Sequence, residues 1–241
     1  MSADLYAQPR PQRFAFALVS KQGYASGGAT KLGVALRPHT PTTFVPTTLY
    51  EKGLPPERGI YVTDVVFDRA GIWNGVVERD GASLPFAIEI HAKASAPVVG
   101  SKAPTVPSPT PTRTLGMNPI CTRTPPCPLH TKSLDTLIGK GRPVAVLFAT
   151  PARCQSQYCG PVLDALLPLV SEYQSRIDFV HCDIYLNNRT DQVEPTVAAW
   201  GLPSEPWLFT VNPHGAITER LDGAMGQDEM RAALNNLART A

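Results

Sequence analysis

The sequence predicts two domains, an all-β domain followed by an α/β domain. In the first part of the 241-residue chain, at residues 13–92, short apolar runs alternate with polar positions every second residue, which is typical of half-buried strands. A proline-dense stretch follows, and beyond it β-type apolar runs alternate with helical patterns. A chain of this length has room for two ordinary domains. We place them at residues 1–95 and 119–241, joined by a linker at 96–118.

The first domain is predicted to be a small antiparallel β-sandwich. Turn signals rich in glycine, proline and aspartate separate five apolar, alternating segments. The segments are residues 14–18, 32–36, 61–67, 71–77 and 84–90. The stretch from Tyr61 to Trp73 resembles the penultimate-strand region of immunoglobulin-like accessory domains on exported bacterial proteins. We expect Trp73 to pack in the core, and the domain to bind, space or stabilise without a catalytic site.

The linker is expected to act as a semi-rigid spacer. It carries five prolines among serine, threonine, alanine and lysine residues: Pro97, Pro104, Pro107, Pro109 and Pro111. Proline fixes φ and removes an N–H donor, so such a stretch favours extended polyproline II. The alternative is an ordered strap that packs across both domains.

Two cysteines lie where a β-type run gives way to a helical pattern. The run Val144–Phe148 precedes Cys154 and Cys159, and a helical pattern at 162–173 follows them. Cysteines at i and i+5 of an ideal helix would have Cα atoms roughly 8–9 Å apart, whereas a disulfide needs less than about 7 Å. If the two pair, Cys154 therefore lies in the loop before the helix, with Ser156 as the N-cap. A helix N-terminus favours the thiolate, which is the species that attacks disulfides.

These features and those that follow resemble the thioredoxin superfamily, over residues 121–241. Val144–Thr150 matches its central strand, residues 177–184 match the next parallel strand, and residues 200–211 match the segment in which the family places a cis-proline. The resemblance implies a thioredoxin-like fold. The chain departs from the family in two ways: four residues separate its cysteines where the family has two, and the central strand lacks a carboxylate.

The resemblance also implies site residues. Cys154 would be the exposed nucleophile and Cys159 the resolving cysteine, although a second alignment matches Cys159 to the family's first cysteine. A cis bond before Pro206 would place the Glu205 backbone beside the redox pair, as the family does to hold the substrate chain. The groove would be shaped by Ser204, Glu205 and Trp207. The chemistry is thiolate attack, a mixed disulfide and its resolution, with protein thiols or disulfides as partners and no organic cofactor.

A second cysteine pair, Cys121 and Cys127, lies just before the thioredoxin-like segment and is followed by His130. We favour a local structural disulfide that anchors the end of the linker. Two other interpretations remain: a second redox pair that exchanges with the first, and a soft-metal site made by Cys121, Cys127 and His130. Cysteine and histidine ligands suit Cu(I) or zinc, and copper-delivery members of the superfamily use a cysteine pair with a distant histidine. Neither pair has zinc-finger spacing.

The fifth cysteine, Cys182, falls in a predicted buried strand, where a free cysteine acts as a small hydrophobic residue. The neighbouring His181 would point to the opposite face of that strand.

Composition limits the partners and the compartment. The formal net charge is +2 and 17% of residues are charged, so no nucleic-acid footprint is expected. No run of about 20 apolar residues is present to span a membrane. Paired cysteines indicate an extracytoplasmic protein. The N-terminus does not show the charged and apolar pattern of an export signal, so we expect that an export signal or a lipid anchor has been removed. That signal or anchor would be the only link to a membrane.

The function predicted from the sequence is an exported thiol–disulfide oxidoreductase. Two alternatives belong to other classes: a metal-handling protein, in particular for copper, that uses the same cysteines, and a non-catalytic interaction module whose cysteines are structural.

Overall fold

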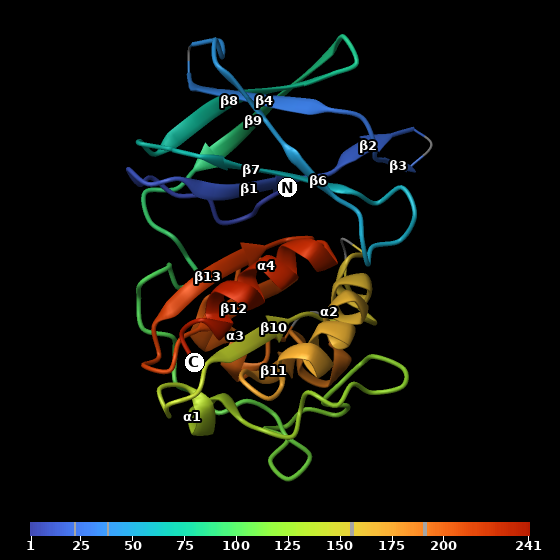
Figure 1. Cartoon of the computed structure of the whole chain (residues 1–241), viewed down its shortest axis with the longest axis vertical. Helices are drawn as coiled ribbons and strands as arrows, with labels where there is room; N and C mark the ends of the chain where they lie inside the picture. Colours follow the sequence, from blue (N-terminus) through green and yellow to red (C-terminus); the bar gives the residue numbers. More distant parts are fainter. Residues whose placement is uncertain (22, 38, 155–156, 190–191) are drawn as a thin grey trace. The chain divides into compact units, whose positions relative to one another are not determined.

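The chain folds into two compact units, Met1–Ala94 and Ser95–Ala241. The structure is a computed structural model that describes residues 1–241 apart from 22, 38, 155–156 and 190–191 (Figure 1). The predicted linker, residues 96–118, belongs to the second unit. Each unit has its own apolar core, so each is described by itself.

The described residues of the first unit form antiparallel strands and loops. The strands are β1 (Gln12–Phe16), β2 (Leu18–Ser20), β3 (Gly23–Ala25), β4 (Thr30–Leu36), β5 (Phe44–Pro46), β6 (Thr48–Tyr50), β7 (Ile60–Val65), β8 (Gly71–Arg79) and β9 (Ala82–Ile90). One sheet has the order β1-β7-β6 and another the order β5-β4-β8-β9, while β2 and β3 form a hairpin. The sequence predicted the five longer strands and missed β2, β3, β5 and β6, which have 3 residues each.

Aromatic side chains fill the core of this unit. Phe14 and Phe67 are buried, and the ring of Trp73 lies edge-on to Phe67 with 5.1 Å between ring centroids. The indole Nε1 of Trp73 donates a hydrogen bond to the carbonyl oxygen of Arg69 at 3.0 Å. Trp73 therefore packs in the core, as predicted, and its one polar atom is satisfied there.

The second unit contains a four-stranded sheet with helices. Its elements are α1 (Leu134–Leu137), β10 (Val144–Phe148), α2 (Cys159–Tyr173), β11 (Asp178–Cys182), the 3₁₀ helix η1 (Leu186–Asn188), α3 (Pro195–Trp200), β12 (Trp207–Val211), β13 (Ile217–Asp222) and α4 (Gln227–Ala238). The sheet order is β11-β10-β12-β13. Strand β10 runs parallel to β11 and antiparallel to β12, and β12 pairs antiparallel with β13.

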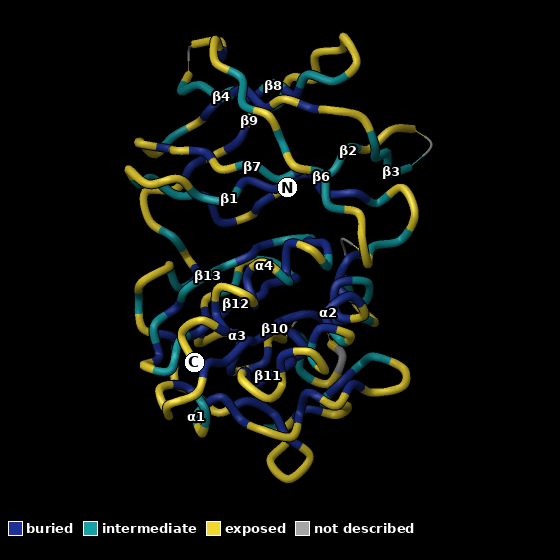
Figure 2. The backbone as a smooth tube through the Cα atoms, in the orientation of Figure 1, coloured by how far each residue is buried: buried dark blue, intermediate teal, exposed yellow. Residues whose placement is uncertain are grey.

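Helices cover both faces of this sheet. Every residue of β10, β11 and β12 is buried, which is what a sheet covered on both sides requires (Figure 2). Val146 and Phe148 of β10 face the cluster that contains Trp200 of α3, with 5.1 Å between the Phe148 and Trp200 ring centroids. The alternate residues of β10 point to the opposite face. Helices α2 and α4 contact each other, and α4 contacts β12.

The proline-rich segment is an ordered part of the second unit, which corrects the expectation of a spacer. Its residues pair with the start of β13: the N–H of Gly100 donates to the carbonyl of Ile217 at 2.8 Å, and the N–H of Ile217 donates to the carbonyl of Ser101 at 2.9 Å. Ala96 and Ala103 are buried in the main core of the unit. The extended conformation that proline favours also suits pairing along a sheet edge, because the residues between the prolines keep their N–H groups.

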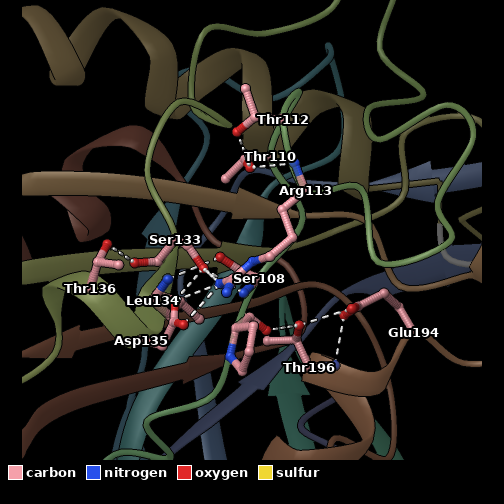
Figure 3. A network of polar contacts seen from close by, with 11 residues as sticks. Ser108, Thr110, Thr112, Arg113, Ser133, Leu134, Asp135, Thr136, Glu194 and Thr196 are labelled. Atoms are coloured by element: carbon pink, nitrogen blue, oxygen red, sulfur yellow. Dashed lines mark hydrogen bonds and ion pairs between the residues drawn. The ribbon is translucent and has the colours of Figure 1, made fainter.

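A polar network fixes the far end of this segment (Figure 3). Ser108 is fully buried; its N–H donates to Ser133 Oγ at 2.8 Å, and its hydroxyl accepts from the N–H of Leu134 at 3.0 Å. The Arg113 guanidinium donates to Ser133 Oγ and to the carboxylate of Asp135, each at 2.8 Å. These bonds tie the proline-rich segment to the first turn of α1.

Candidate functional site

Cys154 and Cys159 form a disulfide where the loop after β10 meets α2. Their Cα atoms lie 5.8 Å apart, within disulfide range. Cys159 is the first residue of α2 and is fully buried, whereas Cys154 lies in the preceding loop and is half-buried. The N–H of Cys159 faces Cys154 Sγ at 3.2 Å. The sequence expectation that Cys154 precedes the first helical turn is confirmed.

The start of α2 differs from the expected cap. Ser156 lies outside the described residues, and the N-cap of α2 is Tyr158, whose side chain makes no capping hydrogen bond. The N–H of Cys159, in the first turn, faces Cys154 Sγ. Such N–H groups stabilise a thiolate on Cys154 when the disulfide is reduced.

Glu205 places a carboxyl group beside this disulfide. One carboxylate oxygen of Glu205 and the sulfur atoms of Cys154 and Cys159 all lie within 4.8 Å of one another. The N–H of Thr150, just after β10, donates to Glu205 Oε2 at 2.7 Å. Burial raises the pKa of Glu205 to about 7, although the hydrogen bonds from Thr150 and Tyr185 lower it. The chain thus holds a group that exchanges protons near neutral pH next to its redox pair.

Sequence reasoning named Glu205 only for its backbone and the groove. It looked for the family's acid on the central strand, where Val144–Thr150 has none. In the structure the acid comes from the loop before β12, because the antiparallel pairing of β10 with β12 sets Phe148 opposite Trp207 and so brings Glu205 to the end of β10. A glutamate directly before the expected cis-proline was the signal that could have found it.

The Glu205–Pro206 bond is cis, as predicted. Pro206 is buried and Ser204 is half-buried. Trp207, expected to shape a substrate groove, is instead fully buried and stacks on Phe209 with 5.5 Å between ring centroids. As the first residue of β12 it belongs to a strand covered on both faces, so it packs in the core and does not line an open groove.

The second cysteine pair does not form the expected disulfide. Cys121 and Cys127 are free and buried, and their sulfur atoms meet two imidazole rings, those of His130 and His181. His181 Nδ1 lies 3.3 Å from Cys127 Sγ, 3.9 Å from Cys121 Sγ and 3.1 Å from His130 Nε2. We call these four residues the Cys₂His₂ cluster. The N–H of Cys127 donates to Cys121 Sγ at 3.4 Å, which holds the two cysteines of the loop together.

The close contacts in the cluster shift the pKa values of its groups in different directions. The hydrogen bond from the Cys127 thiol holds the pKa of Cys121 far below its usual range, and the same bond raises the pKa of Cys127. Burial alone would lower the pKa of His181, but its hydrogen bond with Cys121 and the charge of Asp183 raise it overall. The cluster therefore favours a thiolate on Cys121 facing the imidazole of His181.

Cys182 and His181 are adjacent on β11 and point to opposite faces of the sheet. Cys182 points into the main core and is free, as expected for a small buried hydrophobic residue. His181, on the opposite face, completes the Cys₂His₂ cluster. The sequence pattern puts His181 on that face but indicates no role for it, because its partners precede it in the chain by more than fifty residues.

Strand order, the disulfide at the start of α2 and the cis-proline before β12 give the second unit the architecture expected from the sequence. This unit has a thioredoxin-like fold. Solved structures similar to its part of the chain include a thiol:disulfide interchange protein of the thioredoxin family from Chlorobium tepidum, with 15% identity, a TM-score of 0.40, and coverage of 59% of this chain and 99% of the other. The exposed lipoprotein thioredoxin Etrx1 from Streptococcus pneumoniae has 16% identity, a TM-score of 0.30, and coverage of 44% and 91%.

No family model and no curated protein sequence matches the chain. At the identities and scores of the solved structures, the likeness concerns the path of the backbone, and the chemistry has to be derived from the side chains of this chain. Among the described residues, no helix is long and apolar enough to cross a membrane.

Proposed function

We propose that the chain catalyses thiol–disulfide exchange through Cys154 and Cys159. One observation carries the proposal: a disulfide joins a half-buried cysteine in a loop to a fully buried cysteine at a helix N-terminus, with the carboxyl group of Glu205 beside both. The difference in exposure gives Cys154 and Cys159 different roles. The more exposed sulfur can meet a substrate, and the buried one can react only with its neighbour.

In the reduced protein, the first step is attack by the Cys154 thiolate on a substrate disulfide. A bond forms between Cys154 Sγ and one substrate sulfur, the substrate S–S bond breaks, and the other substrate sulfur leaves as a thiolate. The backbone N–H of Cys159, which faces Cys154 Sγ, stabilises the negative charge before attack.

The second step resolves this mixed disulfide. The Glu205 carboxylate takes the proton of the Cys159 thiol, and the resulting thiolate attacks Cys154 Sγ and releases the remaining substrate thiolate. The substrate has then gained two electrons, and the protein has lost them in forming its Cys154–Cys159 bond. A base with a pKa of about 7 is well matched to this transfer at neutral pH. Run in reverse, the same steps oxidise a dithiol.

The proposal extends to the compartment, the partners and the role of the first unit. The disulfide supports an extracytoplasmic protein, because disulfides persist mainly in oxidising compartments. The partners would be protein thiols or disulfides, contacted at Cys154 and beside Ser204 and Pro206, which flank Glu205 in the sequence. The first unit would be an immunoglobulin-like accessory domain that binds or positions such partners.

The proposal is tested by disulfide exchange between the reduced protein and a disulfide-bonded peptide or insulin, with a thiol reductant present to recycle the protein. Cys154→Ser should abolish exchange, because the attacking sulfur is lost. Cys159→Ser should accumulate a mixed disulfide at Cys154, because resolution is blocked. Cys182→Ala, at the buried free cysteine on β11, is the matched control and should retain the wild-type rate.

Alkylation kinetics supply an independent measurement. In the reduced protein at neutral pH, iodoacetamide should label Cys154 faster than Cys159, as mapped by mass spectrometry. Equal and slow labelling of both cysteines, together with no exchange above the Cys154→Ser background, would favour a structural disulfide in an interaction module.

A further inference from the structure

We propose that Cys121, Cys127, His130 and His181 bind a zinc ion in a closed tetrahedral site. These residues lie outside the redox pair and take no part in the exchange proposed above. The exposed fractions of their side chains are 4%, 6%, 4% and 0%, and one ligand atom of each lies within 4.8 Å of the other three. Four buried ligand atoms that converge from two separate segments form the complete donor set of a Cys₂His₂ zinc site.

The distances match the edges of a zinc tetrahedron. With bonds of about 2.3 Å to sulfur and about 2.0–2.1 Å to nitrogen, neighbouring ligands lie about 3.6 Å apart for sulfur and nitrogen and about 3.3 Å apart for two nitrogens. His181 Nδ1 lies 3.3 and 3.9 Å from the two sulfur atoms and 3.1 Å from His130 Nε2. A central ion would therefore need only small adjustments of the side chains.

Groups behind His181 fix the orientation of its ring. His181 Nε2 lies 2.9 Å from the carbonyl oxygen of Ala149 and 3.5 Å from Asp183 Oδ1. With a proton on Nε2, this nitrogen donates to the Ala149 carbonyl and leaves the Nδ1 lone pair directed at the cluster. A carbonyl or carboxylate behind a histidine ligand is a common feature of metal sites, because it fixes the tautomer and the ring orientation.

The donor set and its compact geometry favour zinc. Two thiolates and two imidazoles suit a four-coordinate zinc ion. A Rieske iron–sulfur cluster uses the same ligand types but divides the cysteines and the histidines between two irons, whereas here Cys127 Sγ lies 3.3 Å from His181 Nδ1. Because all four positions are filled by protein and the site is buried, no position stays open for water or substrate. The ion would be structural and would not take part in chemistry.

The site would stabilise a region that has little regular structure. Between the end of the proline-rich segment and α1 there is no helix or strand among residues 119–133, all of which are described. Cys121, Cys127 and His130 lie in this loop, and His181 lies on β11 at the edge of the sheet. Zinc would cross-link the loop to that edge strand, and its binding free energy would contribute to folding.

The same cross-link would support the redox loop. Thr122, next to Cys121, donates through its N–H to Asp183 Oδ2 at 2.9 Å, and its hydroxyl accepts from the N–H of Ala152 at 3.2 Å. Ala152 lies in the loop that carries Cys154. Zinc would also keep the thiolates of Cys121 and Cys127 coordinated, and so prevent them from exchanging with the neighbouring disulfide.

Metal analysis of the full chain, purified anaerobically without chelator, tests the proposal. About one zinc ion per chain is expected, and X-ray absorption should show two sulfur and two nitrogen neighbours at about 2.3 and 2.0 Å. Cys127→Ser and His130→Asn should each weaken zinc binding by more than about 100-fold in competition with a chromophoric chelator, since a lost ligand costs at least as much as a lost supporting group.

Two control variants locate the site. The double change Cys154→Ser with Cys159→Ser removes the other group of potential ligands, and Cys182→Ala removes the remaining thiol; both should retain zinc. Loss of zinc from the double variant would overturn the assignment. The assignment would also be overturned if the reduced wild-type protein neither contained zinc nor took up added Zn²⁺ or Co²⁺. A Cys121–Cys127 disulfide in the mass map of the wild-type protein would overturn it as well. These readouts measure metal and not exchange, so they stand or fall separately from the redox proposal.

Discussion

The carboxyl group of Glu205 lies where burial favours its neutral form and where a proton acceptor is needed. Its hydrogen bond from Thr150 favours the charged form, and burial outweighs it, so the pKa rises to about 7. A carboxyl group whose pKa is higher in the folded than in the unfolded protein binds its proton more tightly when folded. Its contribution to stability is full below the unfolded pKa of about 4.3 and is lost as the pH rises through the folded pKa.

Glu205→Gln should therefore flatten the pH dependence of stability. We expect the free energy of unfolding of the wild type to fall relative to that of the variant between pH 5 and 8, as measured by urea unfolding at several pH values. Glu89→Gln, on an exposed position of β9, is the control and should retain the wild-type profile. Parallel profiles for wild type and Glu205→Gln would contradict the raised pKa.

The same substitution should slow resolution of the mixed disulfide. The expected loss is about 10²–10⁴-fold, the range of a general base, and the inflection of the rate near pH 7 should disappear. Stopped-flow measurement of the second step separates this effect from a change in Cys154 reactivity. An unchanged rate and pH profile would assign the proton transfer to another group.

At the scale of elements, the proline-rich segment is held by backbone pairing and one buried serine. Ser108 Oγ accepts from the N–H of Leu134 at the first residue of α1, and the N–H of Ser108 donates to Ser133 Oγ. Leu134 is fully buried, so its N–H would have no water to replace a lost acceptor.

Ser108→Ala should lower the free energy of unfolding by about 1–3 kcal/mol, the cost of a buried donor left without a partner. Thr112→Ala, at an exposed position of the same segment, should change it by less than about 0.5 kcal/mol. Chemical denaturation of both variants decides between an anchored strap and a loosely attached spacer, for which the two substitutions would have similar small effects.

In the first unit, one glycine makes room for an aromatic ring. Gly75 on β8 is paired with Phe86 on β9, and a Cβ atom at Gly75 would lie 2.0 Å from the Phe86 ring. That ring stacks on Phe14 in the core, with 6.0 Å between centroids. The glycine is therefore required by packing and not by a turn.

Gly75→Ala should displace the Phe86 ring and destabilise the first unit by about 1–3 kcal/mol, as overpacking does. Hydrogen exchange of the β8 and β9 amides reports on this unit by itself and should show the loss. Ser83→Ala, exposed on β9, is the control. Protection in Gly75→Ala equal to that in the control would show that the ring has another position available.

For the whole molecule, the unit boundary at Ala94 and Ser95 sets where the chain can be divided. The second unit includes the proline-rich segment, whose Ala96 and Ala103 lie in its core. A division at residue 119, suggested by composition, would remove those residues and expose the start of β13.

A chain of residues 95–241 should therefore unfold cooperatively and retain exchange, whereas a chain of residues 119–241 should have a melting temperature lower by more than about 5 °C. Circular dichroism melts of the two fragments measure the difference. Equal melting temperatures would mean that the proline-rich segment contributes nothing to the second unit.

Local features of the sequence were sufficient to predict the longer strands and to identify Cys154 and Cys159 as the candidate redox pair. Period-two alternation marks the longer strands because a half-buried strand must alternate its side chains. The position of Cys154 before α2 follows from covalent geometry, since a disulfide cannot span five positions of an ideal helix. The core position of Trp73 was also predicted from neighbouring residues, and the Glu205–Pro206 cis bond from the resemblance to the thioredoxin superfamily.

Tertiary structure alone decided which distant groups meet. The Glu205 carboxyl reaches the disulfide because β12 pairs with β10 in one register, and His181 joins Cys121 and Cys127 because a loop with no periodic pattern folds onto the edge of β11. The proline-rich segment is core rather than spacer because it pairs with β13. Periodicity records which face of an element is buried, but sheet register and loop packing, which depend on the whole chain, determine what that face contacts.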